Sequence, residues 1–437
     1  MKRSLAKSFA YWKRALTVIP GGTQTLSKGP NMFTFGVYPI YLDHGQGSHV
    51  WDVDGNEYID YPLALGPVTL GYNYPATVRA VCDQMKKGST FSLMNVLEVE
   101  VAELLRECIP CADMSRFAKN GADATSAAVR LSRIYTGREH VAVCGYHGWH
   151  DWYIASTEHD LGVPRAMKEL IHPFTYNDPA SLEKIFAEHP RRIAAVIMEP
   201  VSVELPQPGF LARVKQIARK NGAVLIFDEI VTGFRLALGG AQEYYGITPD
   251  LATFGKGMAN GLPISVLVGR RQIMKEACRM FFSTTYGGET LSLAAARSTI
   301  SLMRQKRVQD RFWKMGDLLK NGTQALVDEH RLGQWIKVKG LSPKFWIDFV
   351  APDGSEYNEL KGLFFQETVS RGVLIGGLQY MSFSHTPQDI KKTLAAFDAA
   401  CGVCCKALKD GNIKKYLSGM PPQNVFKRHK SDTEGDL

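Results

Sequence analysis

Residues 222–235 read GAVLIFDEIVTGFR, and residues 251–263 read LATFGKGMANGLP. Each stretch contains a short apolar run, of the kind that forms a strand buried on both faces of a parallel sheet. Asp228 ends the first run, and Lys256 follows the second. Because ligands of open α/β sheets bind at the carboxyl ends of the strands, we expect both residues to lie at a binding site on that edge.

Apolar runs that alternate with helical patterns continue on both sides of these stretches. Other apolar runs end close to Asn120, Tyr146 and Glu199, and helical periodicity covers residues 75–87 and 95–108. Strands that alternate with helices predict an α/β fold, in which helices flank a mostly parallel sheet. The polar residues that end the runs are therefore the candidates for function.

The length of 437 residues exceeds one ordinary hydrophobic core, so two domains are expected. We expect a large domain at residues 61–310 and a small α+β domain built from both chain ends. The small domain would take an N-terminal helix and β-meander from residues 1–60 and an α+β part from residues 311–420. Residues 421–437 are polar and are expected to form a mobile tail.

The net charge of +9 is modest and spread along the chain. A basic balance can indicate nucleic acid, but no basic motif with interleaved aromatic residues is present, and an anionic cofactor or substrate explains the charge as well. The N-terminal stretch is interrupted by Lys and Arg, which is not typical of a signal peptide, and no run of 18 apolar residues occurs. We therefore expect a cytoplasmic protein that binds neither nucleic acid nor membrane.

The eight cysteines fit a reducing compartment as free thiols. Two pairs have CxxC spacing, Cys108 with Cys111 and Cys401 with Cys404. Some 290 residues separate the pairs, and the second pair lies in an apolar helical pattern, so structural thiols are favoured over a zinc site. The stretch GYHGWHD at 145–151 also lacks a standard metal-ligand spacing. No metal is expected at either place.

Lys256 and Asp228 together have the chemistry that a cofactor with an aldehyde and a pyridine ring requires. Desolvation beside a buried strand lowers the pKa of a lysine and makes its neutral amine a nucleophile toward an aldehyde. A carboxylate at the mouth of a sheet is costly without a partner, and a protonated pyridine nitrogen would be one. Taken singly, Lys256 could be a turn lysine and Asp228 a helix cap or an ion-pair partner. Their combination favours a cofactor site.

In the stretch KNGADATSAAVRLSR at 119–133, a glycine turn is followed by a predicted helix. The first turn of a helix presents unpaired N–H groups that suit a phosphate, and here Gly121 and Ala122 would supply them. Tyr146 could stack on a flat ring. His147 and Glu199, at or just after strand ends, complete the expected wall of the cofactor site.

Together these motifs resemble the class III aminotransferases of fold type I, which use pyridoxal 5′-phosphate (PLP). Within them the sequence is most similar to the glutamate-1-semialdehyde 2,1-aminomutase branch, from IPGG (19–22) to FSHT (383–386). The most specific stretch is 222–235. The lysine of FGKGMANGLP (254–263) follows it at the spacing that resembles the family pattern. WDVDGNEYIDY (51–61) and YHG (146–148) add to the resemblance.

The resemblance implies roles for individual residues. Lys256 matches the lysine that holds PLP as a Schiff base and moves the proton during catalysis. Asp228 matches the partner of the pyridine nitrogen, while Ile230 and Tyr146 match the residues that pack on the two faces of the ring. Gly121 and Ala122 match the phosphate-binding turn. Thr285 matches the threonine that reaches the phosphate of a neighbouring subunit, which implies a homodimer with shared active sites.

The departures from the family pattern concern mainly the substrate region. Ala122 lacks the hydroxyl that usually contacts the phosphate. Lys28 stands where the aminomutases have an arginine that binds the substrate carboxylate, and Leu65 replaces a tryptophan. Glu204 lies near the position of an asparagine, and the segment around Tyr380 lacks the family glutamate. These changes argue against the aminomutase substrate.

We therefore expect a PLP-dependent aminotransferase that moves an amino group between an amino donor and an aldehyde or ketone. The alternative with the same cofactor chemistry is a 2,1-aminomutase. A binding or regulatory protein of this fold is a third hypothesis, which the intact Lys256 disfavours. The polar candidates Lys28, Glu204 and Tyr380 favour a hydrophilic substrate, and a sugar-like carbonyl compound is one candidate.

Overall fold

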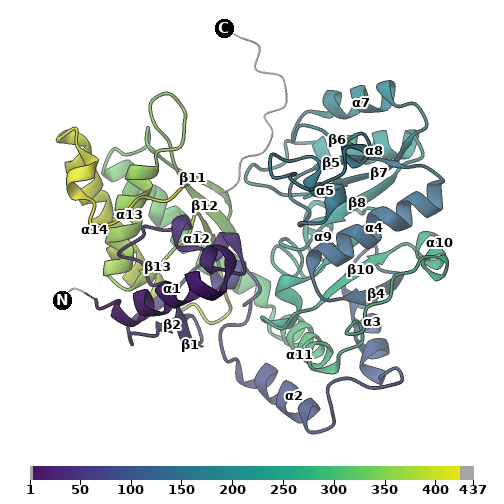
Figure 1. The fold of residues 1–437 in the computed structure, drawn as a ribbon, viewed down its shortest axis with the longest axis horizontal. Helices are drawn as coiled ribbons and strands as arrows, with labels where there is room; N and C mark the ends of the chain where they lie inside the picture. The colour runs from purple at the N-terminus through teal and green to yellow at the C-terminus, as the bar shows by residue number, and fades with distance from the viewer. Residues whose placement is uncertain (1–2, 424–437) are drawn as a thin grey trace. The chain divides into compact units, whose positions relative to one another are not determined.

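The computed structural model describes residues 3–423 as two compact units (Figure 1). The first unit takes residues 3–74 and 310–423, and the second takes residues 75–309. The sequence-based boundary after residue 60 thus differs from the structural one, because residues 61–74 bond within the first unit. Tyr61 shares a hydrogen bond of 2.7 Å with Thr393 through their hydroxyls, and the Phe383 N–H donates to the Thr69 carbonyl. Of the tail expected at 421–437, residues 424–437 lie outside the described residues.

The first unit contains two small sheets. One has the order β1-β2-β3-β13, with β1 to β3 antiparallel and β13 parallel to β3. The other has the order β11-β12-β14 and is antiparallel. The strands are β1 (Leu42–Gln46), β2 (His49–Asp52), β3 (Glu57–Asp60), β11 (Ile336–Leu341), β12 (Lys344–Phe349), β13 (Val373–Leu374) and β14 (Leu378–Tyr380).

Within residues 3–423, the first unit contains four α-helices. They are α1 (Ala6–Val18), α12 (Val308–Glu329), whose first two residues belong to the second unit, α13 (Asn358–Ser370) and α14 (Pro387–Lys409). Helices α13 and α14 pack against each other, with the rings of Phe364 and Phe397 in contact at 5.2 Å between centroids. The two ends of the chain share this core, since β13 pairs with β3 and the ring of Tyr38 lies 6.0 Å from that of Phe365 between centroids.

The second unit is built on a seven-stranded sheet of order β4-β10-β9-β8-β7-β5-β6. Strand β10 is antiparallel to both of its neighbours, and the other neighbouring pairs are parallel. The prediction of a mostly parallel sheet is confirmed. The strands are β4 (Met114–Ala118), β5 (His140–Cys144), β6 (Ile171–Pro173), β7 (Ile193–Met198), β8 (Val224–Asp228), β9 (Leu251–Phe254) and β10 (Ser265–Gly269).

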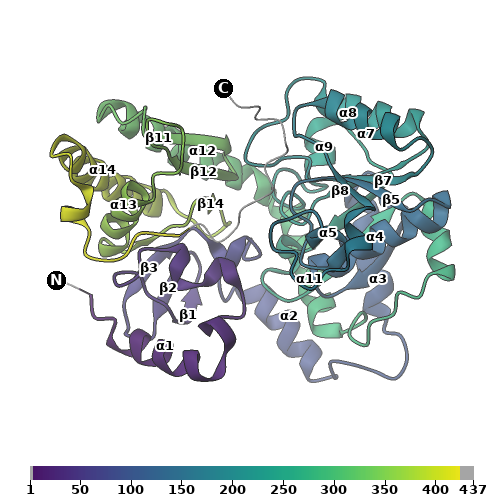
Figure 2. The same cartoon turned by 45° about the horizontal axis from the view of Figure 1, so that its top comes forward.

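Helices cover both faces of this sheet (Figure 2). Helix α4 lies across one face and contacts β4, β7, β8, β9 and β10, while α8 packs on β8 and contacts α7. The helices of the unit are α2 (Pro75–Met85), α3 (Val96–Cys108), α4 (Gly121–Thr136), α5 (Asp151–Ile154), α6 (Arg165–Lys168), α7 (Pro179–Glu188), α8 (Phe210–Lys220), α9 (Ala241–Tyr245), α10 (Arg271–Met274) and α11 (Thr290–Lys306). Among residues 3–423, no helix combines the length and the apolar composition needed to cross a bilayer.

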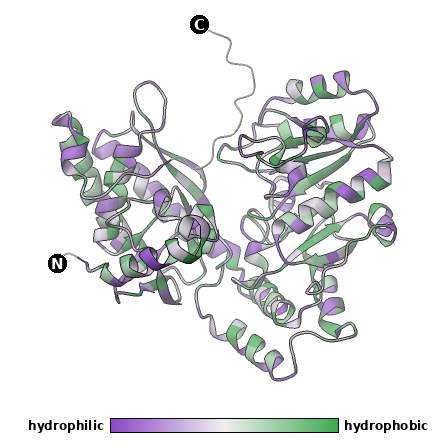
Figure 3. Cartoon of the chain, viewed as in Figure 1, coloured by the Kyte–Doolittle hydropathy of each residue, from purple (hydrophilic) through white to green (hydrophobic). Residues whose placement is uncertain are grey.

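The central strands are apolar because both of their faces are covered. Every residue of β7, β8 and β9 is buried, and these strands are drawn mostly in the hydrophobic colour in Figure 3. Their registers align the carboxyl ends: Met198 lies opposite Phe227, and Asp228 lies opposite Thr253. Residues that directly follow these strands therefore share one edge of the sheet.

The covered sheet predicts a large difference between two substitutions that each remove three carbon atoms. Ile226 in β8 has no exposed surface, whereas Leu161 is 97% exposed. We expect Ile226→Ala to lower the free energy of unfolding by about 2–5 kcal/mol, and Leu161→Ala to change it by less than about 0.5 kcal/mol. Urea unfolding followed by circular dichroism measures both, and equal midpoints would contradict a close-packed interior at β8.

Candidate active site

Lys256 follows β9 at a tight point of the backbone. It begins the short helix η5 (Lys256–Ala259), and its φ of +34° lies in the left-handed region that costs a residue with a side chain roughly 1–3 kcal/mol. The packing around it supports this conformation, because Gly257, Met258 and Ala259 are all buried. A strained backbone at a reactive side chain is common in active sites.

The surroundings of Lys256 favour a neutral amine. Burial lowers the pKa of its ammonium group, and the charge of Arg235 acts in the same direction. The carboxylates of Glu199 and Asp228 oppose this decrease but do not cancel it. The side chain is therefore a better nucleophile at neutral pH than an ordinary lysine.

Asp228 is fixed by donors from three parts of the chain. Its side chain is 5% exposed. One oxygen, Oδ2, lies 2.8 Å from Nδ1 of His147, while Oδ1 accepts from the hydroxyl of Thr253 and the N–H of Ile230, each at 3.1 Å. The ring of His147 is fully buried beside this carboxylate. His147, expected in the cofactor wall, is thus placed to act on a cofactor through Asp228.

Ile230 occupies the space between two glycines. A Cβ atom added to Gly121 would lie 3.2 Å from Cδ1 of Ile230, and one added to Gly255 would lie 3.1 Å from the same atom. Both distances are shorter than ordinary contacts, so a larger residue at either glycine would displace Ile230. The branched side chain therefore lies beside both the start of α4 and the residue before Lys256.

The start of α4 is held by side chains that leave its first amides facing outward. Asp123 accepts from the N–H of Asn120 at 2.8 Å, and Ser265 donates to the Asn120 carbonyl at 2.6 Å. The N–H groups of Gly121 and Ala122 belong to the first turn, where a helix leaves donors without intrahelical partners. This end of α4 can hold a phosphate through backbone donors and the helix dipole.

The loop after β5 packs directly on this helix end. Thr125 of α4 donates to the His147 carbonyl at 2.8 Å. Gly148 has a φ of +105°, and a Cβ at this position would lie 2.6 Å from Cβ of Ala122. Only glycine fits this contact, which connects the phosphate turn to the partner of Asp228.

Tyr146 in the same loop remains half exposed. Its N–H donates to Oε2 of Glu199 at 3.0 Å, and its ring meets that of Tyr153 edge-on at 5.6 Å between centroids. Burial raises the pKa of its hydroxyl, and the charges of Asp228 and Glu199 add to the increase. An aromatic ring with one accessible side at this edge can stack on a flat cofactor.

Three of the four expected substrate residues belong to the first unit. Leu65 ends the turn η4 (Leu63–Leu65), whose three residues all have positive φ, and the ring of Tyr380 lies against the next residue, with Cε1 3.0 Å from a Cβ built on Gly66. The structure thus brings Leu65 and Tyr380 together. Lys28 is exposed at the end of η2 (Leu26–Lys28). Glu204 is exposed in the loop after β7 of the second unit.

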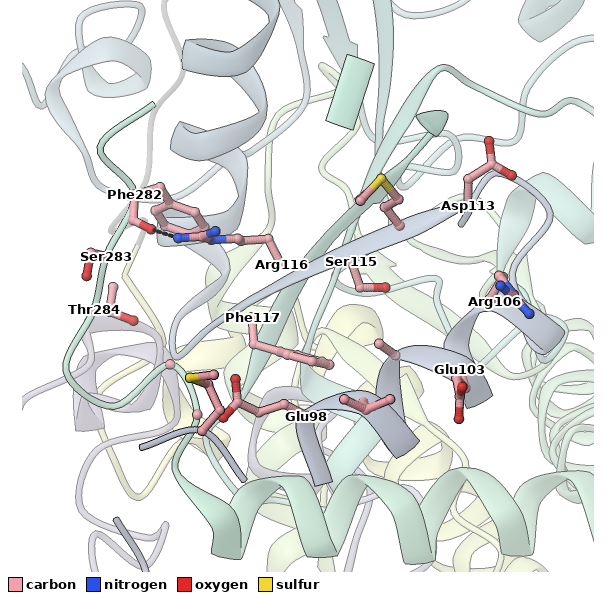
Figure 4. Close-up of a pocket in the computed structure, with 16 residues that line it drawn as sticks. Glu98, Glu103, Arg106, Asp113, Ser115, Arg116, Phe117, Phe282, Ser283 and Thr284 are labelled. Carbon is pink, nitrogen blue, oxygen red and sulfur yellow. Dashed lines mark hydrogen bonds between the residues drawn. The ribbon is translucent and has the colours of Figure 1, made fainter. Parts of the chain in front are cut away.

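Thr285 lies in an exposed segment beside a surface groove of about 590 Å³ (Figure 4). The groove is lined by α3, β4 and residues 282–288, and it contains neither Lys256 nor Asp228. Across it, Arg116 donates to the Phe282 carbonyl at 2.6 Å. This hollow is therefore distinct from the site built around the strand ends.

Sequence reasoning missed Thr253, Arg235 and Gly148. Thr253 is a lone hydroxyl in the apolar run before Lys256, and comparing the ends of neighbouring strands would have placed it opposite Asp228. Gly148 is one of many glycines, and only its positive φ and its approach to Ala122 distinguish it. Arg235 is almost wholly buried, which its position in a turn-like stretch does not indicate.

These side chains fit PLP as a group. A nucleophilic amine suits the aldehyde, a fixed carboxylate suits the pyridine nitrogen, a helix start suits the phosphate, and Ile230 with Tyr146 suit the two faces of the ring. A family model for class III aminotransferases matches residues 34–391. The chain belongs to this family.

Individual relatives agree with this assignment. A 3-aminobutyryl-CoA aminotransferase of Cloacimonas acidaminovorans is 37% identical over 90% of this chain and 96% of its own length. A glutamate-1-semialdehyde 2,1-aminomutase of Desulforamulus reducens is 34% identical over 91% and 98%. The PLP-bound FumI protein of Sphingopyxis sp. MTA144 superposes with a TM-score of 0.87 and 29% identity over 95% of this chain and 99% of its own. The class III protein described here is thus a PLP-dependent enzyme of aminotransferase type with fold type I.

The lowered pKa of Lys256 predicts how the class III protein takes up PLP. Only the neutral amine attacks the aldehyde, so a lower pKa moves the rise in rate to lower pH. We expect the rate of PLP incorporation into cofactor-free protein to level off below pH ~10.4, the ordinary value for lysine. Stopped-flow absorbance measures this rate, with Nα-acetyllysine as the reference amine. A plateau at the same pH for protein and reference would contradict the prediction.

Proposed function

We propose that this enzyme carries an amino group from a small-molecule amino donor to an aldehyde or ketone at Lys256, with Asp228 as its main electrostatic partner. The observation that carries the proposal is the pairing of a lysine of lowered pKa with a buried carboxylate at the same sheet edge. When bound, PLP acts as an electron sink for the carbon–nitrogen bond of the substrate. The chain supplies position and proton transfer.

Lys256 has two tasks in this proposal. Its amine would hold the cofactor through Nζ, and when free it would accept and return a proton at the substrate carbon that carries the amino group. Burial favours the neutral form of this amine, which is the form that accepts a proton. The nearby carboxylates of Glu199 and Asp228 stabilise the ammonium form that follows.

Asp228 holds a proton at the ring nitrogen, which preserves the electron-withdrawing character of the cofactor. His147 and Thr253 keep the carboxylate in place. Ile230 and Tyr146 would confine the ring between them, and Glu199 fixes the backbone of Tyr146. These residues would hold the ring in one orientation beside Lys256.

Gly121 and Ala122 would bind the phosphate through their N–H groups. Ala122 provides no hydroxyl, so binding depends more on the backbone and on Thr285, which we place at the phosphate of a neighbouring subunit. Lys28, Leu65, Tyr380 and Glu204 are proposed to contact the substrate. The 3-aminobutyryl-CoA aminotransferase among the relatives makes amino-acyl thioesters a class to test, alongside hydrophilic and sugar-like carbonyl compounds.

A 2,1-aminomutase remains the second candidate, because an aminomutase of that kind is 34% identical over most of the chain. The two outcomes differ in one step: an aminomutase returns the amino group to the same carbon skeleton. Lys28 in place of the expected arginine disfavours it, since an ammonium group cannot form a two-pronged contact with a carboxylate.

Variants of the catalytic pair test the proposal. We expect Lys256→Ala to abolish the visible absorption band of lysine-bound PLP and to reduce amino transfer by more than about 10³-fold, and Asp228→Asn to reduce it by about 10²-fold or more. Lys220→Ala, at the exposed end of α8, is the control and should retain full activity.

The assay is a screen of amino donors and acceptors that follows the spectral change of bound PLP. Glutamate 1-semialdehyde is included as the discriminating substrate. Turnover of it without an added donor would favour the aminomutase, whereas full donor turnover by Lys256→Ala would exclude the proposed role of the lysine.

We also propose a homodimer. Apolar side chains are exposed on residues 91–99 and 281–286: Leu93 is 80% exposed, Met94 85% and Phe281 86%. They lie on segments that line or border the groove in Figure 4. Clustered exposed apolar residues of this kind mark protein interfaces, and Thr285 lies in the second of these segments.

Mixed dimers test the shared site. A hydrogen bond to a charged phosphate contributes about 1.5–3 kcal/mol, so Thr285→Ala should weaken PLP binding by about 10- to 100-fold. In a dimer of one Lys256→Ala chain and one Thr285→Ala chain, sharing leaves one site with both residues. We expect up to half of the normal activity at low PLP concentration. An inactive mixed dimer would place Thr285 at its own subunit's site, and a monomer would exclude the dimer.

A cytoplasmic location is part of the proposal. All eight cysteines are free, and burial raises the pKa of those at 108, 111, 401 and 404, which makes them poor nucleophiles. Free thiols in this number are typical of a reducing compartment.

A further inference from the structure

Three histidines meet at one edge of the large sheet. His140 begins β5, His172 is the middle residue of β6, and His189 follows the last residue of α7. Because Ala142 lies opposite His172 and side chains alternate along a strand, His140 and His172 point to the same face of the sheet. The ring of His189 joins them, with its centroid 4.0 Å from that of His172 and 5.1 Å from that of His140.

The imidazole nitrogens of this three-histidine cluster are close together. Nδ1 of His140 lies 2.8 Å from Nε2 of His172, and one nitrogen of each of the three rings lies within 4.8 Å of the others. His140 is 4% exposed, so its Nδ1 meets Nε2 of His172 in a buried place.

We propose that the three-histidine cluster binds one divalent transition-metal ion, of which Zn²⁺ is the typical case. Three imidazoles without a carboxylate suit Zn²⁺, Co²⁺ or Ni²⁺ rather than Mg²⁺ or Ca²⁺. Zn–N bonds of about 2.0–2.1 Å in tetrahedral geometry require nitrogens about 3.3 Å apart. The nitrogens of the cluster lie between 2.8 Å and 4.8 Å apart, so modest ring rotations produce this spacing. Water completes the fourth position.

Some groups near the three-histidine cluster favour the binding of a cation, and others oppose it. Burial, together with the charges of His189, His140 and Arg192, lowers the pKa of His172 to about 4. The neutral form of His172 is therefore favoured at neutral pH, and this is the form that ligates metals. Arg192 and Arg133 also repel a cation at His140, while Glu139 attracts one. The two arginines therefore weaken the binding of a cation, and Glu139 offsets part of their effect.

The place of the cluster indicates a structural role. His140 is at the amino end of β5, and the four steps to Cys144 at the other end span about 13 Å. Tyr146 and the proposed PLP site lie beyond that far end. Strand β6 is the last strand of the sheet, has three residues and ends in Pro173, which donates no hydrogen bond. The ion would join this weakly paired strand and the end of α7 to β5.

The experiment is a Co²⁺ titration of the full-length, PLP-loaded protein carrying Cys82→Ser and Cys278→Ser, which removes the exposed thiols. We expect one Co²⁺ per chain, with the visible bands of a four- or five-coordinate site. His172→Phe keeps a flat ring without nitrogens, and His189→Ala removes a ligand at a helix end. Each should weaken binding by more than about tenfold, the lower limit for groups that only support a metal ligand.

His44→Gln is the matched control, because His44 is an exposed histidine beside Asp43. Zn²⁺ should raise the Tm of the parent protein and of this control, but not of the His172 or His189 variants, and should leave kcat unchanged. The intact PLP absorption band checks that each variant folds. Equal Co²⁺ affinity, or an equal rise in Tm, in parent and both ligand variants would overturn the proposal whether or not amino transfer is confirmed.

Discussion

The buried carboxylate of Asp228 is the constraint on which the active site depends. A charge at 5% exposure is costly unless donors compensate it. Two of the donors are side chains from outside β8, on His147 and Thr253, and the third is the N–H of Ile230. Each donor requires a different segment to be in place. The protein alone thus orients this carboxylate, which suits the partner of a positively charged ring nitrogen.

Side chains around Asp228 alternate between two faces, which explains the order of residues Asp228, Glu229 and Ile230 in the stretch at 222–235. Asp228 faces the site, and the next residue, Glu229, is fully buried away from it. Glu229 accepts from the N–H groups of Ala241 and Gln242 at 2.7 and 2.8 Å, at the start of α9. Burial raises the pKa of Glu229, and these donors oppose the increase. Ile230 then returns to the site. Asp228 is thus held at the sheet edge, and Glu229 fixes the turn that follows.

Much of this arrangement follows from the sequence because it depends on strand ends. Apolar runs that stop at Asp228 and before Lys256 place both residues at one edge of a parallel sheet. The contact of Thr253 with Asp228 requires the register of β8 and β9, and that of Gly148 with Ala122 requires the path of a loop. His140, His172 and His189 belong to three separate elements, so no spacing motif connects them. Such contacts depend on tertiary packing, which local patterns do not encode.

The division of the chain places the proposed PLP site and most of the proposed substrate residues in different units. Lys256, Asp228 and the start of α4 belong to the second unit, and their bonds are made within it. Three of the four proposed substrate residues belong to the first unit, which is built from both chain ends. A change at Lys28 or Leu65 therefore leaves the donors of Asp228 and the pKa of Lys256 untouched. Most departures from the aminomutase pattern lie at the proposed substrate positions, and the departure within the proposed PLP site is Ala122, which has no hydroxyl.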